Sequence, residues 1–249
     1  MRNTIYDVEK ITARGVLPAS VLEEGVWEEF VKSNYSSENA RKTLGNFGHY
    51  NGELIQSSPF RITALANMNP EKPGVFPNGQ KPATRDDIEA MVRKQPNYFD
   101  GVYSDFGLSL MTGTDSHKPN ELLAETLYDE LRKRELEIGE GILIPFFALS
   151  LEEDANSAYG LIFKINSKLS SKEVREQLRN LQDYKWDWSR TEGLSRAYRG
   201  DRYWDRYDWD LAYSDSYGRV VGVCEGDAPK NLLSYSEEDW RNAFERAGF

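Results

Sequence analysis

The chain has 249 residues, with 39% hydrophobic and 12% aromatic side chains and a formal net charge of -10. So high an aromatic content excludes an intrinsically disordered chain, because disordered sequences lack the large apolar groups that offset the entropy of ordering. The single cysteine excludes an intrachain disulfide, and the acidic balance argues against a protein that tracks nucleic-acid phosphates.

Membrane and secretion signals are missing from the sequence pattern. The first fifteen residues contain no apolar run of the kind that signal peptides carry. The longest apolar run, 142–149, includes a proline and is too short to cross a bilayer. We therefore expect a cytoplasmic protein, of a cell or of an infected host cell, with no membrane contact.

Apolar spacing and capping residues predict six helices. Thr84 with Asp87, and Ser170 with Glu173, have the spacing of capping boxes, and Pro119 suits a first helical position. Gly45 is typical of a residue that ends a helix. The predicted helices cover 20–31, 37–44, 84–95, 119–134, 170–181 and 236–247.

Strand signals concentrate in the second half. Two apolar runs, 142–151 and 158–165, flank an acidic turn and predict a β-hairpin, and 218–224 has the composition of a buried strand. In the first half only 60–65 reads as a strand. The segments 67–83 and 96–118 read as long loops, which are usually functional or mobile.

These elements define an α+β fold class. Hairpins and separate helices, without strand–helix alternation, predict an antiparallel sheet built mainly from the C-terminal half and packed with about six helices. We interpret 1–249 as a single domain. A subdivision into a helical, loop-rich part (1–135) and a β-β-α-β-β-α part (136–249) is the alternative.

The segment 184–218 is the most unusual stretch. It holds four of the six tryptophans, interleaved with charged residues. From 203 onward the odd positions are mostly large aromatic or apolar residues, a period of two that predicts a strand forming a hairpin with 218–224. Residues 184–200 are expected to be an irregular lead-in.

Two interpretations of these aromatic residues remain open. They form either the core of the sheet or a recognition surface, because Tyr and Trp supply rigid contact area with a polar tip. If the odd positions face inward, the functional set is the polar face, Trp204, Arg206, Asp208 and Asp210. The complete set of candidate binding residues is Trp186, Trp188, Trp204, Arg206, Asp208, Trp209 and Asp210.

Candidates for catalysis are few. Asp205, Asp208 and Asp210 could supply paired carboxylates, although adjacent acids are expected by chance among 41 acidic residues. The two histidines are too few for a histidine-based metal site, and Cys224 lies in an apolar run where a thiol is inert. With no nucleotide-binding loop or dinucleotide fingerprint, we expect no cofactor and no metal.

The sequence therefore favours a non-enzymatic function. The leading hypothesis is an acidic soluble protein-binding module, such as an inhibitor, immunity or phage-type accessory protein, whose partner is another protein. The alternative is a carboxylate-dependent enzyme or a binding protein for a carbohydrate-like polar ligand, in which the aromatic rings would stack on the ligand.

Overall fold

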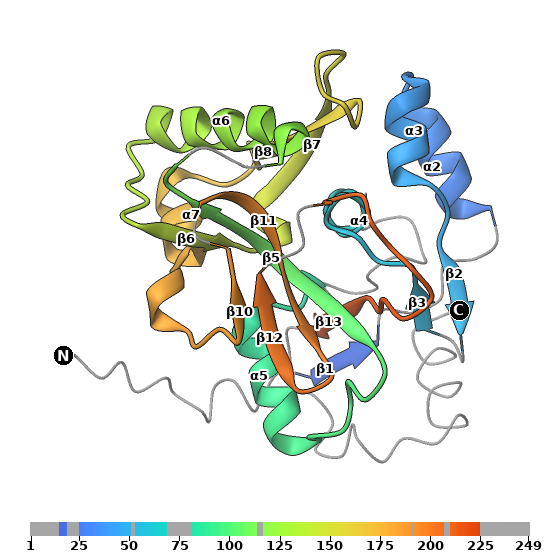
Figure 1. Cartoon of the computed structure of the whole chain (residues 1–249). Helices are drawn as coiled ribbons and strands as arrows, with labels where there is room; N and C mark the ends of the chain where they lie inside the picture. The colour runs from blue at the N-terminus through green and yellow to red at the C-terminus, as the bar shows by residue number, and fades with distance from the viewer. Residues whose placement is uncertain are drawn as a thin grey trace.

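A six-stranded sheet forms the centre of the molecule (Figure 1). The computed structural model describes residues 15–18, 25–50, 53–68, 81–113, 117–190, 192–206 and 210–224. All neighbouring strands in this sheet are antiparallel except β10 and β12, which are parallel. In spatial order the strands are β10 (Trp188–Ser189), β12 (Tyr203–Arg206), β11 (Gly193–Gly200), β5 (Tyr103–Met111), β6 (Gly141–Ile144) and β9 (Arg179–Asn180).

The α+β class and the mainly C-terminal origin of the sheet are confirmed, because every strand of this sheet except β5 follows residue 136. The described part of the chain contains six α-helices. In Figure 1, α5 lies below β12 and α6 lies at the top over β8, and the two helices pack on opposite faces of the sheet. The helices are α2 (Val26–Asn34), α3 (Glu38–Leu44), α4 (Pro59–Asn67), α5 (Arg85–Lys94), α6 (Lys118–Lys133) and α7 (Ser171–Gln177).

Smaller β units surround the central sheet. The strands β7 and β8 form the predicted antiparallel hairpin. Of the other two units, β2 with β3 is also local, whereas the three-stranded unit joins distant parts of the chain. The bounds are β7 (Leu149–Glu153) with β8 (Leu161–Ile165), β2 (Gly48–Tyr50) with β3 (Glu53–Ile55), and β13 (Val221–Cys224) between β1 (Gly15–Pro18) and β4 (Lys81–Pro82).

The sheet separates two hydrophobic clusters. One contains Leu108, Leu110 and Leu194 and continues into α2, α3, α4 and α6. The other contains Phe106, Leu143 and Ala197 and continues into α5 and β13. Both faces of the central strands are therefore covered over much of their length.

The helices predicted to begin at Ser37, Thr84 and Ser170 are confirmed, although the last of them ends at Gln177 and not at 181. Ser37 accepts a hydrogen bond from the Ala40 amide at the start of α3, and the capping boxes of Thr84 and Ser170 begin α5 and α7. The helix predicted over 20–31 is observed from Val26, and residues 19–24 lie outside the described residues. The helix predicted over 236–247 lies entirely outside the described residues.

Three strand or loop predictions are wrong. The segment 60–65 lies in α4, which Ser58 caps, and its residues Pro59–Leu65 are all buried, so no polar face reveals the helical period. The predicted loop 96–118 contains β5, and the predicted irregular lead-in 184–200 contains β11. Both strands are buried on both faces, which weakens the alternation of apolar and exposed polar residues by which a half-buried strand is identified.

The hairpin predicted between 203 and 224 is also wrong. The strand at 203 ends at Arg206 and pairs with β11 and β10, whereas β13 pairs with β1 and β4. The run 142–151 is not one strand either, because Pro145 and a 3₁₀ turn at Phe146–Ala148 separate β6 from β7. Proline lacks the amide hydrogen that would continue the backbone hydrogen bonding between strands.

Candidate functional site

A β-bulge decides which side chains share a face at the centre of the sheet. Ala197 pairs with Gly107 and Tyr198 pairs with Asp105, so Phe106 is the extra residue in β5. A bulge interrupts the alternation of side chains along a strand. Two faces result, the network face (Tyr103, Asp105, Arg196, Tyr198 and Asp205) and the ladder face (Phe106, Ala197, Arg199, Trp204 and Arg206).

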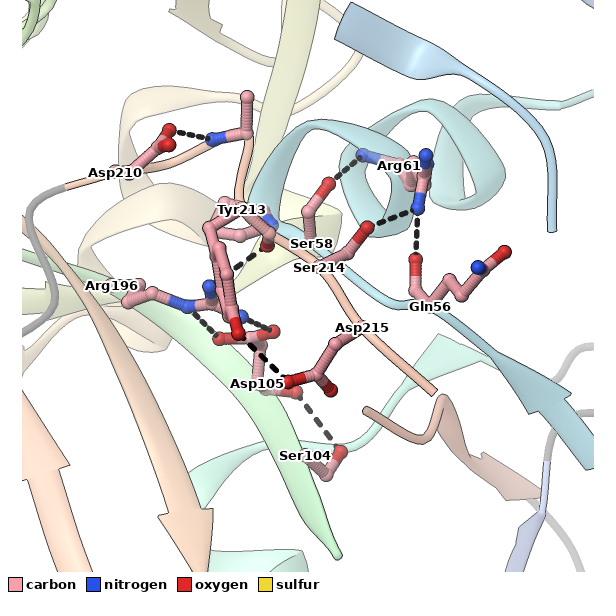
Figure 2. A network of polar contacts seen from close by, with 12 residues as sticks. Gln56, Ser58, Arg61, Ser104, Asp105, Arg196, Asp210, Tyr213, Ser214 and Asp215 are labelled. Carbon is pink, nitrogen blue, oxygen red and sulfur yellow. Dashed lines mark hydrogen bonds and ion pairs between the residues drawn. The ribbon is translucent and has the colours of Figure 1, made fainter. Parts of the chain in front are cut away.

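A buried ion pair lies at the centre of the network face. Arg196 donates from Nε to Asp105 Oδ1 at 2.7 Å and from Nη2 to Asp105 Oδ2 at 2.5 Å. Its third nitrogen, Nη1, donates to the main-chain oxygen of Tyr213 at 2.9 Å (Figure 2). The two side chains are 1% and 0% exposed. The pair therefore neutralises Asp105 and fastens the segment 210–218 over the sheet.

A second buried arginine fastens the same segment from the opposite side. Arg61 of α4 donates to the Ser214 hydroxyl at 2.5 Å and to the main-chain oxygens of Gln56 and Leu44 (Figure 2). Burial lowers the pKa of Arg61 to about 10. The segment 210–218 is thus held between α4 and the sheet by two guanidinium groups.

A row of tyrosines crosses the network face. The rings of Tyr103 and Tyr198 are 5.7 Å apart, and those of Tyr198 and Tyr203 are 6.5 Å apart, both edge to face. Tyr198 donates its hydroxyl to Asp205 Oδ2 at 2.8 Å. Burial, followed by the Asp205 charge, raises the pKa of Tyr198, and burial raises that of Tyr103. Both phenols therefore stay protonated at neutral pH.

The tyrosine row leads to an exposed surface that we call the aromatic patch. The described residues include four exposed large hydrophobic side chains, and all four belong to the segment 184–218 and make up the patch. Register places Trp188 beside Asp205, Asp205 beside Tyr198 and Tyr198 beside Asp105, so Trp188 is on the network face. The members are Trp188 (63% exposed), Tyr203 (38%), Tyr213 (47%) and Tyr217 (61%).

The opposite face carries alternating arginines and tryptophans. The guanidinium carbon of Arg85, the first residue of α5, lies 3.4 Å from the ring centre of Trp204 and 4.9 Å from that of Trp186. Arg199 approaches Trp204 to 4.9 Å and Arg206 approaches Trp186 to 5.6 Å. We call this set the arginine–tryptophan ladder. Cation–π contacts of this kind fasten α5 to the sheet.

The predicted binding residues divide between the two faces. Trp186, Trp204 and Arg206 lie in the ladder, the tryptophans half-buried and the arginine buried, whereas Trp188 is in the aromatic patch. Asp210 is half-buried and accepts a hydrogen bond from the Ala212 amide at 2.9 Å. The remaining two, Asp208 and Trp209, lie outside the described residues.

The carboxylates proposed for catalysis divide in the same way. Asp205 is buried on the network face and accepts from Tyr198, Asp210 caps a turn, and Asp208 lies outside the described residues. Tyr198 lies between two aspartates on neighbouring strands, because it pairs with Asp205 on one side and with Asp105 on the other. Asp105 is therefore the second carboxylate to consider. Its two oxygens both accept from Arg196, which leaves it poorly suited to proton transfer.

Sequence reasoning missed Asp105, Arg196 and Arg61. Asp105 and Arg196 come from segments read as a loop and an irregular lead-in, and Arg61 from a segment read as a strand. The available signal was Leu194, Arg196 and Tyr198 alternating with Ser195 and Ala197, a period of two in which one face carries a charge. Arginine on a buried strand needs a partner, and the sequence does not name one.

The described residues contain no group of three His, Cys, Asp or Glu side chains that could hold a metal ion. None of their helices has the length and apolar character needed to cross a membrane. A groove of about 850 Å³ lies away from both faces, between the end of α6 and the residues that follow it, and is lined by Glu125, Tyr128, Asp129, Leu131, Arg132 and 135–139.

The fold and the site together define an α+β protein with a charge-neutralised, tyrosine-covered sheet face. Comparison with known protein families, with curated proteins and with solved structures finds no match for this chain.

Proposed function

We propose that this chain is a protein-binding module that contacts its partner through the aromatic patch. The observation that carries the proposal is the position of the exposed large hydrophobic side chains. In the described part of the chain, all four lie in the segment 184–218, and the strand register places Trp188 and Tyr203 on the same face of the sheet. Tyr and Trp are the side chains that most often dominate binding energy at protein interfaces.

The structure beneath the patch supports binding more than chemistry. The Asp105–Arg196 pair, the Arg61 contacts and the tyrosine row hold the segment 210–218 in one conformation. A surface that is ordered before binding loses less entropy when the partner docks. The same contacts occupy the Asp105 carboxylate, and burial raises the pKa of the Tyr103 and Tyr198 phenols, so these groups serve as supports and hydrogen-bond donors.

Acidic side chains in the same stretch indicate the charge of the partner. Asp187 and Asp201 are exposed, and Asp215 accepts a hydrogen bond from the Tyr213 hydroxyl at 2.8 Å. The whole chain carries a net charge of -10. Complementary charge accelerates association and disfavours wrong partners. We therefore expect a basic surface on the partner protein.

Affinity measurements on patch variants test the proposal. Proteins captured by the tagged full-length chain would be purified and titrated against the wild type, Trp188→Ala and Tyr217→Ala. Loss of one central aromatic contact is worth about 2 kcal/mol or more, which is roughly a thirtyfold rise in Kd. Lys172→Ala, on the exposed side of α7, is the control and should leave Kd unchanged. Partners that bind every variant equally well would contradict the proposal.

A second candidate function is the binding of a carbohydrate-like ligand. The observation that favours it is the register of Trp188 with Asp205, which places an exposed ring and a carboxylate on neighbouring strands of one face. A sugar would stack on the exposed ring, whereas the Asp205 carboxylate is buried and already accepts from Tyr198, so recognition would depend on the ring. A glycan array separates the two functions. A signal lost in Trp188→Ala supports ligand binding, and a blank array beside a measured protein partner excludes it.

A further inference from the structure

The arginine–tryptophan ladder contains buried hydrogen-bond donors that have no acceptor. Among the described residues, Arg85 Nε and Nη1, Arg199 Nε and Arg206 Nε are buried without a hydrogen-bond partner. Their side chains belong to residues that are 3%, 5% and 8% exposed. Buried polar groups in folded proteins are almost always paired, so several unpaired donors in one cluster call for a physical reason.

The charges of the ladder are also poorly compensated. The carboxylate nearest to Arg85 is that of Glu89, 3.8 Å from Nε, and Glu89 also binds Arg93 at 2.9 Å. Asp86, another acid that acts on Arg85, accepts from the Tyr184 hydroxyl and lies 3.6 Å from Arg179. None of these carboxylates is within hydrogen-bond distance of Arg85.

The other two guanidinium groups make neutral contacts. Arg199 donates to the main-chain oxygen of Asp201 at 3.1 Å. Arg206 reaches the Ser109 hydroxyl at 3.5 Å and the Met111 sulfur. The charges of Asp187 and Asp201 both act on Arg199, but their carboxylates accept from main-chain amides, those of Trp204 and Gly101 respectively. Within the part of the chain that the structure describes, the ladder thus holds three positive charges without a hydrogen-bonded carboxylate, in a protein whose net charge is -10.

Repulsion and desolvation both act on these groups. Arg85 and Arg199 both approach the ring of Trp204, and the charge of Arg199 lowers the pKa of Arg85, after the larger effect of burial. Burial likewise lowers the pKa of Arg199 and of Arg206. An anion between or beside the guanidinium groups would reverse both effects, because it would supply the missing acceptor and the missing charge.

We propose that the arginine–tryptophan ladder is a binding site for an oxyanion, carried by a phosphate or carboxylate ligand. Trp186, Trp204 and Tyr184 are only half-buried, so the outer edge of the ladder reaches the surface. The tryptophan rings already contact guanidinium groups, so they are not available to stack on a ring of the ligand. The ligand would therefore be recognised through hydrogen bonds to its anionic group. Guanidinium groups bind such oxyanions in forked geometry.

The site is separate from the aromatic patch. It occupies the ladder face, whereas the patch occupies the network face of the same sheet. Variants of the patch should therefore leave anion binding unchanged, and variants of the ladder distinguish the two proposals.

Nuclear magnetic resonance of the arginine Nε–H groups tests the site directly in the full-length protein. Sodium phosphate and sodium acetate would be added separately at constant ionic strength, with sodium chloride as the reference salt. We expect saturable shifts of the Nε–H signals of Arg85, Arg199 and Arg206 with at least one oxyanion and no such shifts with chloride. A response to phosphate alone identifies a phosphate ligand, and equal responses identify a general oxyanion site.

Variants complete the test. Arg206→Met and Arg199→Met each remove one donor group and should weaken anion binding by about tenfold. Arg132→Met, on the exposed surface of α6, is the matched control and should leave binding unchanged. Arg85→Met would remove the third donor group. If that variant fails to fold, the wild-type titration and the Arg199 and Arg206 variants still test the anion site. The proposal is overturned if the Nε–H signals do not shift with either oxyanion, or if they shift equally with chloride.

Discussion

At the scale of single residues, the Asp105–Arg196 pair needs accurate geometry, because burying its two charges costs free energy. Both side chains are fully buried, and each compensates the charge of the other. Desolvating two charges costs several kcal/mol per ion, and good geometry with additional hydrogen bonds is needed to offset this cost. Arg196 meets that condition because its remaining nitrogen donates to Tyr213. The pair thus joins two strands and a loop that are distant in the sequence.

Removing one member of this pair should destabilise the protein strongly. Arg196→Met leaves the Asp105 carboxylate buried without its partner, and we expect the free energy of unfolding to fall by about 3–5 kcal/mol. Urea denaturation measures this change. Adding Asp105→Leu to Arg196→Met should recover part of the loss, since no isolated charge then remains.

The exposed pair of Arg132 and Asp129 provides the control. Its nitrogen–oxygen distance is 2.7 Å, close to that of the buried pair, but the side chains are 78% and 60% exposed. Arg132→Met should cost less than about 1 kcal/mol, because water already solvates both groups. Equal effects of the two arginine substitutions would show that burial of the Asp105–Arg196 pair has no energetic consequence.

At the scale of elements, the β7–β8 hairpin is held against α3 by several polar contacts. Thr43 donates to the Tyr159 oxygen at 2.8 Å, and Asn39 donates to the Ala158 oxygen at 3.1 Å. The hairpin loop approaches α3 so closely that Gly160 has no room for a side chain. A Cβ atom there would lie 2.6 Å from the Ala40 nitrogen. This glycine therefore sets the distance between the two elements.

Two glycine substitutions separate backbone strain from steric contact. Gly160 and Gly139 both have positive φ, +67° and +52°, but a Cβ atom at Gly139 would meet nothing within 4 Å. Gly139→Ala should cost about 1 kcal/mol from the left-handed backbone alone. Gly160→Ala should cost a further 1–3 kcal/mol, roughly, because the hairpin must move away from α3. Thermal unfolding of both variants measures the difference, and equal melting temperatures would contradict the close packing.

At the scale of the whole molecule, one sheet joins the two halves of the chain. The strand β5, from the first half, lies between β11 and β6, from the second. Asp105 and Phe106 of β5 supply the network face and the ladder face respectively. Both candidate sites therefore depend on residues from each half.

Separating the halves should abolish folding. We expect the fragment 136–249, produced alone, to lack a cooperative thermal transition, because β6 and β11 would lose the strand that joins them. Circular dichroism during heating measures this transition, with the full-length chain as the control. A fragment that melts cooperatively would instead support the subdivision at residue 136.

Local signals in the sequence determined much of the secondary structure. Thr84, Ser170 and Pro119 mark helix starts because capping and φ restriction involve only neighbouring residues. The hairpin 149–165 is identifiable for the same reason, since its acidic turn lies between two apolar strands that pair with each other. The α+β class follows from the order of these elements.

Only the tertiary structure decided where the sites lie. Asp105 and Arg196 are 91 positions apart, and nothing local indicates that they pair. The segment 184–218 was recognisable as unusual, but its division into an exposed patch and a buried ladder was not. For the strand residues of this segment, that division follows from the register of β12 against β11 and β10, and the bulge at Phe106 places Asp105 and Phe106 of β5 on opposite faces. Side chains alternate between faces, so register, a long-range property, determines which aromatic residues meet water.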